Sequence, residues 1–252
     1  MTADGSGVMI VTGGSRGIGA ATARLAARRG YAVCVNYQRD ARAADSVVGD
    51  IAASGGRAIA LHADVAREGE VERLFDRVDR TLGPVTALVN NAGLTGHFSR
   101  LDEADPEVLR RVVEVNLLGV LWCCRAAIRR MSTRHGGAGG GIVNLSSAAA
   151  TLGSAGTYVW YAATKGAVDS LTVGLARELA REGVRVNAVS PGYVDTEIHA
   201  ASGMPDRVEK DAQILPMGRA ATAEEIAGPI LWLLSEESSY TTGAVLRVSG
   251  GR

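Results

Sequence analysis

The chain has 252 residues, of which 46% are hydrophobic and 21% charged, a balance typical of one globular domain. Basic and acidic residues each number 27, so no net charge favours nucleic acid or an anionic membrane as a partner. The three cysteines, Cys34, Cys123 and Cys124, form neither a disulfide framework nor a metal-ligand pattern, and we expect no metal site.

The N-terminal residues show no signal-peptide pattern, and no apolar run reaches membrane-spanning length, so we expect a cytoplasmic protein. Val8 to Thr12 is predicted to be a buried strand, and Ala20 to Arg29 a helix. Between them lies a glycine-rich loop, Gly13-Gly14-Ser15-Arg16-Gly17-Ile18-Gly19. A loop in this position brings backbone N–H groups and a helix N-terminus to a phosphate, although a plain turn is the alternative.

The next strand, predicted over Ala32 to Asn36, ends in Asn36-Tyr37-Gln38-Arg39, with no carboxylate before Asp40. In dinucleotide-binding folds an acidic residue here bonds a ribose 2′-hydroxyl, whereas a basic residue accommodates a 2′-phosphate. Arg16 and Arg39 therefore favour NADP over NAD, the alternative being that both arginines are merely solvated.

Strands and helices alternate through the rest of the chain. Further strands are predicted over Arg57–His62, Ala87–Val89, Ile142–Leu145, Arg185–Val189 and Ala244–Val248, and helices over Ala41–Ser54, Glu68–Leu82, Pro106–Arg134, from about Tyr161 to Glu182, and from the N-cap Thr222 to Leu234. This alternation predicts a single α/β domain of Rossmann type, a doubly wound parallel seven-stranded sheet with helices on both faces. We expect a cofactor part over about 1–145, a substrate and catalytic part over about 146–252, and a lid at about 195–218.

Four positions carry ionisable or buried polar groups for which a chemical role can be considered. Tyr161 and Lys165 stand four residues apart, on one face of a helix, where an ammonium would lower the phenol pKa and make a general acid or base. Such a pair also occurs on solvated helix faces. Asn116 lies within an apolar run, and its position alone favours a structural role over holding a water. Asp64, just past a strand end, suits an adenine amino group or a turn cap.

Together these segments resemble the short-chain dehydrogenase/reductase (SDR) family over nearly the whole chain, most closely its glucose-dehydrogenase-like and ketoacyl-reductase-like members. The motifs that carry the resemblance are Thr12-Gly-Gly-Ser-Arg-Gly-Ile-Gly19, Asp64-Val65, Asn90-Asn-Ala-Gly93, Asn116, Ser147, Tyr161-Ala-Ala-Thr-Lys165 and Pro191-Gly192. Each motif is weak alone, but their order and spacing together are specific.

The resemblance implies roles for these residues. Tyr161 would be the general acid/base, Lys165 would lower its pKa and bond the nicotinamide ribose, Ser147 would hold the substrate oxygen, and Asn116 would position a water. The cofactor would be bound by Gly13, Ser15, Arg16, Gly17, Ile18, Gly19, Asn36, Tyr37, Arg39, Asp64, Val65, Asn90, Ala92, Gly93, Tyr161, Lys165, Pro191, Gly192, Val194 and Thr196. The resemblance also implies a homotetramer built through two long helices and the last strand, with a dimer as the second choice.

The chain departs from the family pattern in two places. Ser147 and Tyr161 are 14 residues apart, one more than is common in the family, so we keep Ser147 in the catalytic role with Ser146 as the fallback. The family's common Asp-Gly-Gly near the C-terminus is Ser249-Gly250-Gly251 here. We expect an NADP(H)-dependent oxidoreductase of a small-molecule carbonyl or alcohol. The alternatives are an NAD-linked dehydrogenase and a non-catalytic nucleotide-binding sensor of the same fold.

Overall fold

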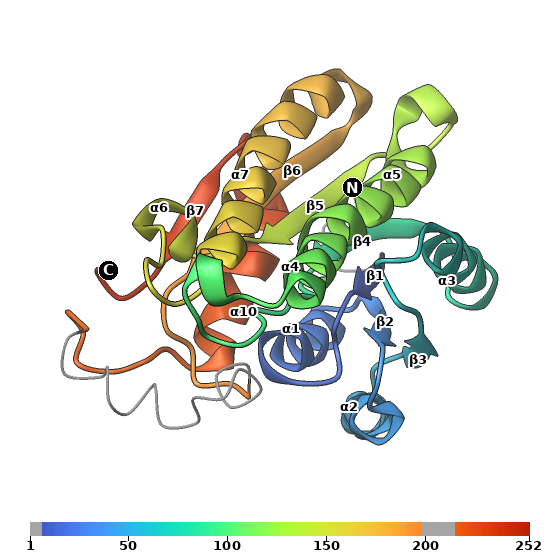
Figure 1. Cartoon of the computed structure of the whole chain (residues 1–252). Helices are drawn as coiled ribbons and strands as arrows, with labels where there is room; N and C mark the ends of the chain where they lie inside the picture. Colours follow the sequence, from blue (N-terminus) through green and yellow to red (C-terminus); the bar gives the residue numbers. More distant parts are fainter. Residues whose placement is uncertain (1–6, 198–214) are drawn as a thin grey trace.

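The computed structural model of the chain describes residues 7–197 and 215–252. Its strands form one parallel sheet in the order β3-β2-β1-β4-β5-β6-β7, with helices on both faces (Figure 1). The predicted single, doubly wound α/β domain is thus confirmed. The strands are β1 (Val8–Val11), β2 (Ala32–Tyr37), β3 (Ala58–His62), β4 (Val85–Asn90), β5 (Gly140–Leu145), β6 (Val184–Pro191) and β7 (Val245–Val248). The helices are α1 (Gly17–Arg28), α2 (Ala41–Ala53), α3 (Glu68–Thr81), α4 (Pro106–Val113), α5 (Gly119–Met131), α6 (Ala149–Leu152), α7 (Val159–Leu179) and α10 (Ala223–Leu234).

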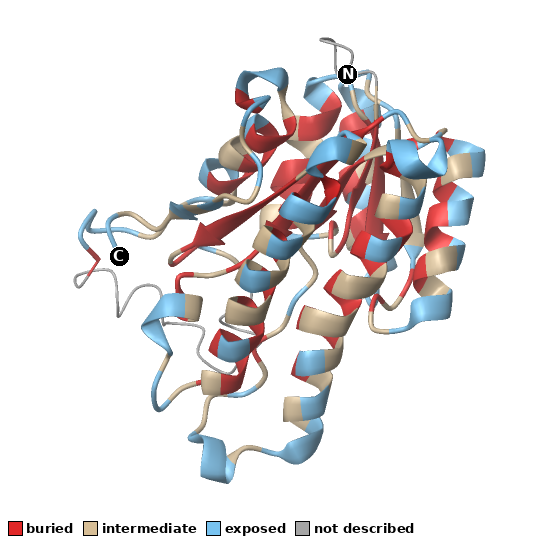
Figure 2. Cartoon of the chain, turned by 90° about the horizontal axis from the view of Figure 1, so that it is seen from above, coloured by how far each residue is buried: buried red, intermediate tan, exposed pale blue. Residues whose placement is uncertain are grey.

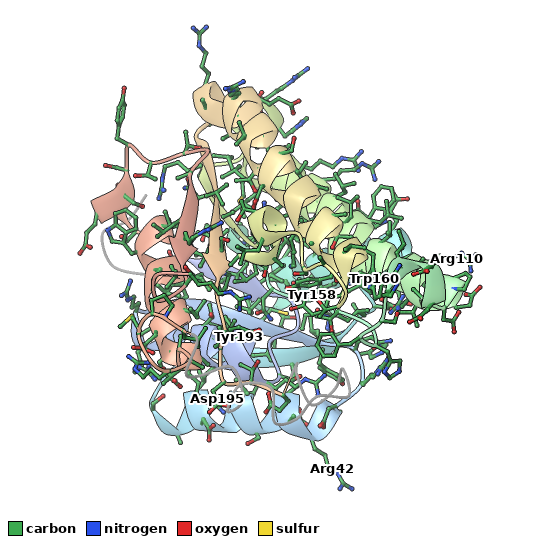
Figure 3. All side chains as sticks on the ribbon, turned by 60° about the vertical axis from the view of Figure 1, so that its left-hand side comes forward. Arg42, Arg110, Tyr158, Trp160, Tyr193 and Asp195 are labelled. Carbon is green, nitrogen blue, oxygen red and sulfur yellow. The ribbon has the colours of Figure 1, made fainter. Side chains whose placement is uncertain are left out.

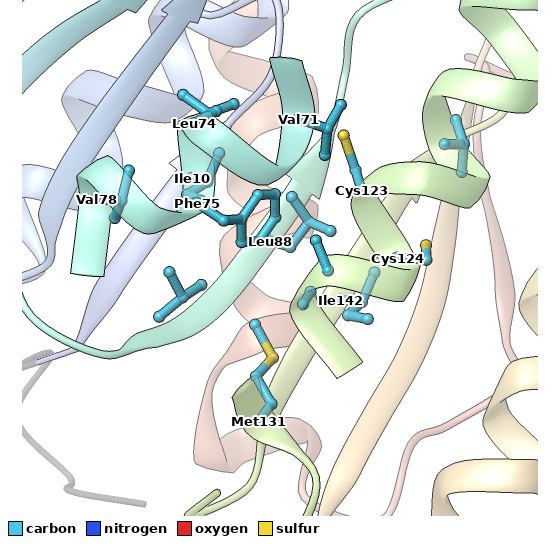
Figure 4. Packing of buried hydrophobic residues seen from close by; sticks show 14 of the residues in the cluster. Ile10, Val71, Leu74, Phe75, Val78, Leu88, Cys123, Cys124, Met131 and Ile142 are labelled. Carbon is cyan, nitrogen blue, oxygen red and sulfur yellow. The ribbon is translucent and has the colours of Figure 1, made fainter. Parts of the chain in front are cut away.

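The sheet is buried on both faces, because successive residues of a strand point to opposite sides. On β1, Val8 and Ile10 join a core formed with α3, α5 and α7, whereas Met9 and Val11 join a core formed with α1, α2 and α10. Figure 2 shows the buried residues concentrated in the sheet, and Figure 4 shows side chains of α3 and α5 packing against the first face. Two cores thus hold the sheet rigid between its helices.

The order of the strands reverses between β1 and β4, which lie side by side. Thr12 joins the carboxyl ends of these strands, because its Oγ1 accepts hydrogen bonds from the backbone N–H groups of Asn91 and Ala92, each at 3.0 Å. In open α/β sheets, ligands bind in the crevice at such a reversal. The fold therefore brings the glycine loop and the Asn90–Gly93 segment to the expected ligand crevice.

The single helix predicted over Pro106–Arg134 is divided into α4, a π-helical turn (Glu114–Leu118) and α5. Asn116 lies in the π-helical turn and pairs with the main chain of Leu94, which donates to Oδ1 at 2.9 Å and accepts from Nδ2 at 2.8 Å. A π-helical turn holds one more residue than an α-helical turn and is common at functional sites. The turn accompanies the pairing of Asn116 with a segment 22 residues away.

The strand predicted over Ile142–Leu145 begins two residues earlier than expected, because Gly140 and Gly141 begin β5. A Cβ atom on Gly140 would lie 2.5 Å from the Thr86 carbonyl oxygen, and one on Gly141 would lie 2.7 Å from Leu234 Cδ2. These two glycines are therefore strand residues that allow close packing. The capping box predicted for α10 is confirmed, since Thr222 and Glu225 bond each other's backbone N–H groups.

The proposed lid at 195–218 lies mostly outside the described residues. Its flanks are described: Val194 bridges Ala221, Asp195 N–H donates to the Ala221 carbonyl oxygen and Ala221 N–H to that of Tyr193, both at 2.9 Å. The two ends of this segment are thus joined at the sheet. Among the helices of the described residues, none is both long enough and apolar enough to cross a membrane.

Substitution of two helical glycines by alanine should have opposite effects on stability. A Cβ atom on Gly19 would overlap the Gly13 carbonyl oxygen and lie 2.5 Å from Asn91 Nδ2, whereas a Cβ atom on Gly49 would meet nothing within 4 Å. We expect Gly19→Ala to lower the free energy of unfolding by about 1–3 kcal/mol through overpacking. Gly49→Ala should raise it by about 0.5–1 kcal/mol through helix propensity. Urea unfolding measures both, and equal midpoints for the two variants would contradict this account.

Candidate active site

Tyr161 and Lys165 lie in the first two turns of α7, which begins at Val159. Both are buried, with 9% and 4% of their surface exposed, and Lys165 Nζ is 5.6 Å from the centre of the Tyr161 ring. The helix start lies beside the carboxyl end of β5, because Lys165 Nζ donates to the Leu145 carbonyl oxygen at 2.6 Å. The pair therefore lies inside the protein and not on a solvated helix face.

The pKa of Tyr161 is raised to about 12, mainly by burial and to a lesser extent by the nearby Tyr158. A hydrogen bond with the Ser147 side chain acts in the opposite direction. With the chain's own groups alone, the predicted decrease of the tyrosine pKa is therefore wrong. The reason is that desolvation of the phenolate outweighs the hydrogen bond. At neutral pH, Tyr161 is accordingly a neutral phenol that can give up a proton.

The two neighbouring serines point in different directions. Ser147 is hydrogen-bonded to Tyr161. The buried Ser146 instead lies with its Oγ 3.4 Å from the Lys165 carbonyl oxygen. Of the two candidates, only Ser147 meets the phenol.

The segment between Ser147 and Tyr161 contains α6, which the sequence pattern did not predict, and a turn with left-handed backbone conformations. Gly153, Ser154 and Gly156 have φ values of 75°, 53° and 72°. The residue that lengthens the serine-to-tyrosine spacing is thus absorbed in a loop between two helices, and the pairing of Ser147 with Tyr161 is retained.

Lys165 is a cation held in an apolar interior. Burial lowers its pKa to about 8, and Asp169 opposes this shift. Gly93 lies against the same site, because a Cβ atom there would lie 3.7 Å from Lys165 Nζ and 3.4 Å from Asn116 Oδ1. Asn116 is fully buried, and besides Leu94 it donates to Thr164 Oγ1 at 3.3 Å. The structure thus gives Asn116 the structural role that its position predicted and also places it beside the lysine site.

The glycine loop has the geometry of an anion site. Gly13 and Gly17 adopt positive φ values of 60° and 50°. The first turn of α1 contains no acidic residue, and its N-cap Arg16 makes no side-chain capping hydrogen bond. The backbone N–H groups of this turn are therefore left for a ligand, with the helix dipole favouring an anion. Thr196 closes over the loop, since a Cβ atom on Gly17 would lie 3.1 Å from its Cγ2.

Asn91 fixes the glycine loop, although the sequence analysis gave it no role. Its Nδ2 donates to the carbonyl oxygens of Thr12 and Gly13, each at 2.9 Å. By contrast, the side chain of Asn90 turns into the interior, where it donates to Asn144 Oδ1 at 2.8 Å and to Cys124 Sγ at 3.3 Å. Only the main chain of Asn90 is left to face the crevice. The sequence offered one signal for this role of Asn91, namely a side-chain amide directly after the strand that neighbours the glycine loop.

At the end of β2, Asn36 is buried and accepts from Gly13 N–H at 3.4 Å while donating to the carbonyl oxygens of Leu61 and Ala63. Tyr37 packs edge-on against His62, with 5.7 Å between the ring centres. Asn36 therefore joins the glycine loop to the ends of β2 and β3.

Both predicted phosphate ligands, Arg16 and Arg39, are exposed, and neither forms an ion pair within the described residues. Arg39 Nε donates to the Gln38 side chain at 3.1 Å. Asp40, the first carboxylate after β2, caps α2 by accepting from Ala43 N–H at 2.9 Å. The adjacent Arg42 points away from the body of the protein (Figure 3).

Asp64 already has partners. Its Oδ2 lies 2.8 Å from Arg111 Nη2, and its Oδ1 accepts from Ala66 N–H at 3.1 Å. The next residue, Val65, is buried against Gly119 of α5. The carboxylate of Asp64 is thus held in a fixed orientation beside the strand end.

Further predicted residues lie around the crevice. Pro191 ends β6 and accepts from Ala148 N–H at 2.8 Å, which links the segment after Ser147 to Gly192 and Val194. Aromatic rings form one wall: Tyr158 packs against Phe98 and Tyr161 with ring centres 5.0 and 5.2 Å apart, and Trp160 Nε1 donates to the Thr95 carbonyl oxygen at 2.8 Å. Figure 3 shows Tyr158 and Trp160 at the start of α7 and Tyr193 after β6. Of the remaining predicted positions, Ser15 and Ala92 belong to the two loops at this edge, and Ile18 lies in the first turn of α1.

Within residues 7–197 and 215–252, no group of three or more histidine, cysteine, aspartate or glutamate side chains could hold a metal ion. All three cysteines are buried, and burial raises the pKa of each thiol. These thiols are poor nucleophiles, because the thiolate is the reactive form.

Comparison with known proteins gives consistent similarities. The sequence profile of a family described as "Enoyl-(Acyl carrier protein) reductase" matches residues 13–252. The uncharacterized oxidoreductase YgfF of Escherichia coli K12 is 47% identical over 245 residues, which cover 97% of this chain and 99% of that protein. The cis-4-hydroxycyclohexanecarboxylate dehydrogenase of Sinomonas cyclohexanicum is 42% identical over 245 residues, covering 97% and 95%. The crystal structure of a blue fluorescent protein from a metagenomic library in complex with NADPH superposes with a TM-score of 0.90 at 32% identity, covering 99% of both chains.

Replacing the buried lysine should stabilise the protein. A pKa lowered from 10.5 to about 8 corresponds to about 3 kcal/mol of unfavourable free energy for the charged group in the folded state. Lys165→Met removes this cost and loses one hydrogen bond worth about 1 kcal/mol, so we expect about 2 kcal/mol more stability at pH 7. The wild-type protein should gain stability relative to the variant as the pH rises from 8 to 10.5, because the unfolded state then binds more protons. Urea unfolding at both ends of this range tests the prediction, and a destabilised variant at pH 7 would refute it.

Proposed function

Since the chain belongs to the short-chain dehydrogenase/reductase family of NAD(P)-dependent oxidoreductases, we propose that it transfers a hydride between NADP(H) and a carbonyl or secondary alcohol, with Tyr161 as the general acid and base. The hydrogen bond between the Tyr161 phenol and Ser147, above the buried ammonium of Lys165, is the observation that carries this proposal. The substrate is a small molecule, and we propose no nucleic acid or membrane partner.

The chain's own groups support the reductive direction. A phenol with a pKa of about 12 is protonated at neutral pH and is ready to protonate a carbonyl oxygen. Ser147 holds the phenol and offers a hydroxyl donor where negative charge develops on that oxygen. The ammonium of Lys165 stabilises the phenolate left behind, because opposite charges attract strongly away from water. Asn116 keeps Leu94, and with it the Gly93 segment, in place against Lys165.

We propose that the crevice binds a dinucleotide. The uncapped first turn of α1 and the glycine loop support binding of a pyrophosphate, and Thr196 beside Gly17 and Lys165 beside Gly93 support contacts with the rest of the molecule. When bound, the nicotinamide supplies or accepts the hydride. We propose for cofactor binding the residues predicted from the resemblance, with Asn90 acting through its main chain and Asn91 added as the residue that fixes the loop.

Preference for NADP(H) over NAD(H) is supported by the end of β2. No free carboxylate follows the strand, because Asp40 is engaged as the N-cap of α2, and Arg39 and Arg16 are exposed there. A structural neighbour has been determined with NADPH. The aromatic wall of Phe98 and Tyr158 supports a substrate with an apolar portion, and a relative is named for oxidation of a ring-borne alcohol. An NAD-linked dehydrogenase is the second candidate.

We also propose a homotetramer in the cytoplasm. A groove of about 410 Å³ between α5 and α7 is lined by apolar side chains, including Leu121, Trp122, Leu171 and Leu175. At the sheet edge, Val245 of β7 and Trp232 of α10 are partly exposed. Both surfaces suit self-association, and pairing through the first alone would give a dimer. Light scattering distinguishes these states from the 26.1 kDa monomer.

NADPH oxidation with a panel of aldehydes, diketones, ketoacyl esters and cyclic ketones tests the acid. We expect Tyr161→Phe to lower kcat by about 10²- to 10⁴-fold. The neighbouring Tyr158→Phe serves as the control, and its kcat should stay within a few-fold of that of the unaltered protein.

The rate of alcohol oxidation should increase as the pH rises from 6 to 9, since the phenol must first lose a proton, whereas the rate of carbonyl reduction should not. Tight NADPH binding without turnover of any compound in either direction would favour the non-catalytic sensor.

Arg39 should discriminate between the two cofactors. We expect Arg39→Ala to weaken NADPH binding by about tenfold or more, because a charge-assisted hydrogen bond to the 2′-phosphate is lost, and to leave NADH binding unchanged. Arg42→Ala removes the same charge from the adjacent outward-pointing residue and should alter neither affinity. Fluorescence titration measures the dissociation constants of NADPH and NADH for each variant. Unchanged NADPH affinity in Arg39→Ala would refute the role of this residue.

A further inference from the structure

Asp169 is a carboxylate that the proposed reaction does not use. It lies on α7 one turn after Lys165, on the same side of the helix. Its Oδ1 is buried and finds no hydrogen-bond partner within the described part of the chain. A buried acceptor of this kind is costly, and most such groups are paired. The position of Asp169 therefore calls for an explanation other than stability.

Groups from three elements face this carboxylate. The hydroxyl of Ser146, just after β5, and two cations, Lys165 of α7 and Arg247 of β7, act on it. Arg247 is itself anchored on Thr151 of α6. Burial raises the pKa of Asp169 above its usual value, and each of these three groups opposes that rise and so favours the ionised carboxylate. The ionised Asp169 in turn raises the pKa of Lys165.

We propose that Asp169 is a positioning residue for the ammonium of Lys165 in the active site, with Ser146 and Arg247 as the neighbours that favour its carboxylate form. The inference rests on the proposed function, which gives the charged lysine its use. It also explains why Ser146, although it does not meet Tyr161, lies beside the catalytic helix.

Asp169 acts on Lys165 by its charge and forms no direct contact with the ammonium. Lys165 and Asp169 form no ion pair within 4 Å, so the carboxylate acts on the ammonium through the poorly screened interior. The ammonium has three N–H donors, and Leu145 takes one of them. A directly paired carboxylate would occupy another. By acting at a distance, Asp169 preserves the charge and leaves donors free for a ligand.

The composition of the chain makes Lys165 directly measurable. Among its 27 basic residues are only two lysines, Lys165 and Lys210, the second of which lies outside the described residues. Labelling with lysine carrying ¹³C at Cε gives two side-chain NMR signals, and Lys210→Arg leaves only that of Lys165. Its chemical shift against pH then reports the pKa of this one ammonium in the protein without substrate or cofactor.

In the Lys210→Arg background we expect Asp169→Asn, which keeps the shape and removes the charge, to lower the Lys165 pKa by about one unit. Asp169→Ser is a second neutral variant with the same expectation, and Asp169→Glu should restore most of the shift. Glu178→Gln removes an exposed charge from the same helix and should change nothing. The alkaline limb of NADPH-dependent turnover should move to lower pH by the same amount in the neutral variants alone.

A Lys165 pKa that is unchanged or raised in the neutral Asp169 variants would overturn the proposal. Because the NMR titration of Lys165 requires no turnover, it tests the role of Asp169 even if the chain reduces no carbonyl. Conversely, a normal shift in a protein that binds NADPH without catalysis would leave the role of Asp169 intact and refute the proposed function.

Discussion

An ammonium group held in the interior is the constraint on which the site depends. Lys165 is almost fully buried, and its charge disfavours folding, yet four segments are arranged around it. The Leu145 carbonyl oxygen at the end of β5 accepts a hydrogen bond from it, Gly93 approaches without a side chain, Asn116 lies next to Gly93, and Asp169 supplies opposite charge. The two hydrophobic cores give the sheet and α7 the rigidity needed to keep this unfavourable group in one position. Stability is thus given up at the position where positive charge is useful.

Two amides connect this site to the remainder of the fold. Asn116 interrupts a long helix with a π-helical turn and pairs with the main chain after β4, whereas Asn91 pairs with the main chain after β1. Both residues fix segments that have no regular structure of their own. The crevice at the reversal of strand order therefore has walls whose backbone is defined by side-chain hydrogen bonds, which is the kind of preorganisation that binding and catalysis require.

Local patterns were sufficient to predict the architecture. Alternating apolar runs and amphipathic segments indicated all seven strands of the sheet, and the spacing of Tyr161 and Lys165 indicated one helix face. The features that sequence reasoning missed depend on contacts between distant segments. The π-helical turn requires Leu94, the inward orientation of Asn90 requires Asn144, and the raised pKa of Tyr161 depends on how deeply the helix start is buried. Leu94 lies 22 residues from Asn116, and Asn144 lies 54 residues from Asn90, so neither contact belongs to a local motif. The choice between Ser146 and Ser147 likewise needed the orientation of the strand end.

The bridge between Val194 and Ala221 has a consequence for how such a chain diversifies. It joins the two ends of residues 195–220 just after β6 and just before α10, so the described chain on either side is held together independently of what lies between. The entropy of closing a loop grows only logarithmically with its length, by about 0.6 kcal/mol for each doubling. Insertions, deletions and wholesale exchange of this segment are therefore thermodynamically inexpensive. A laboratory that grafts the corresponding segment of a relative between these two anchors should therefore be able to change the sequence between them at little cost in stability.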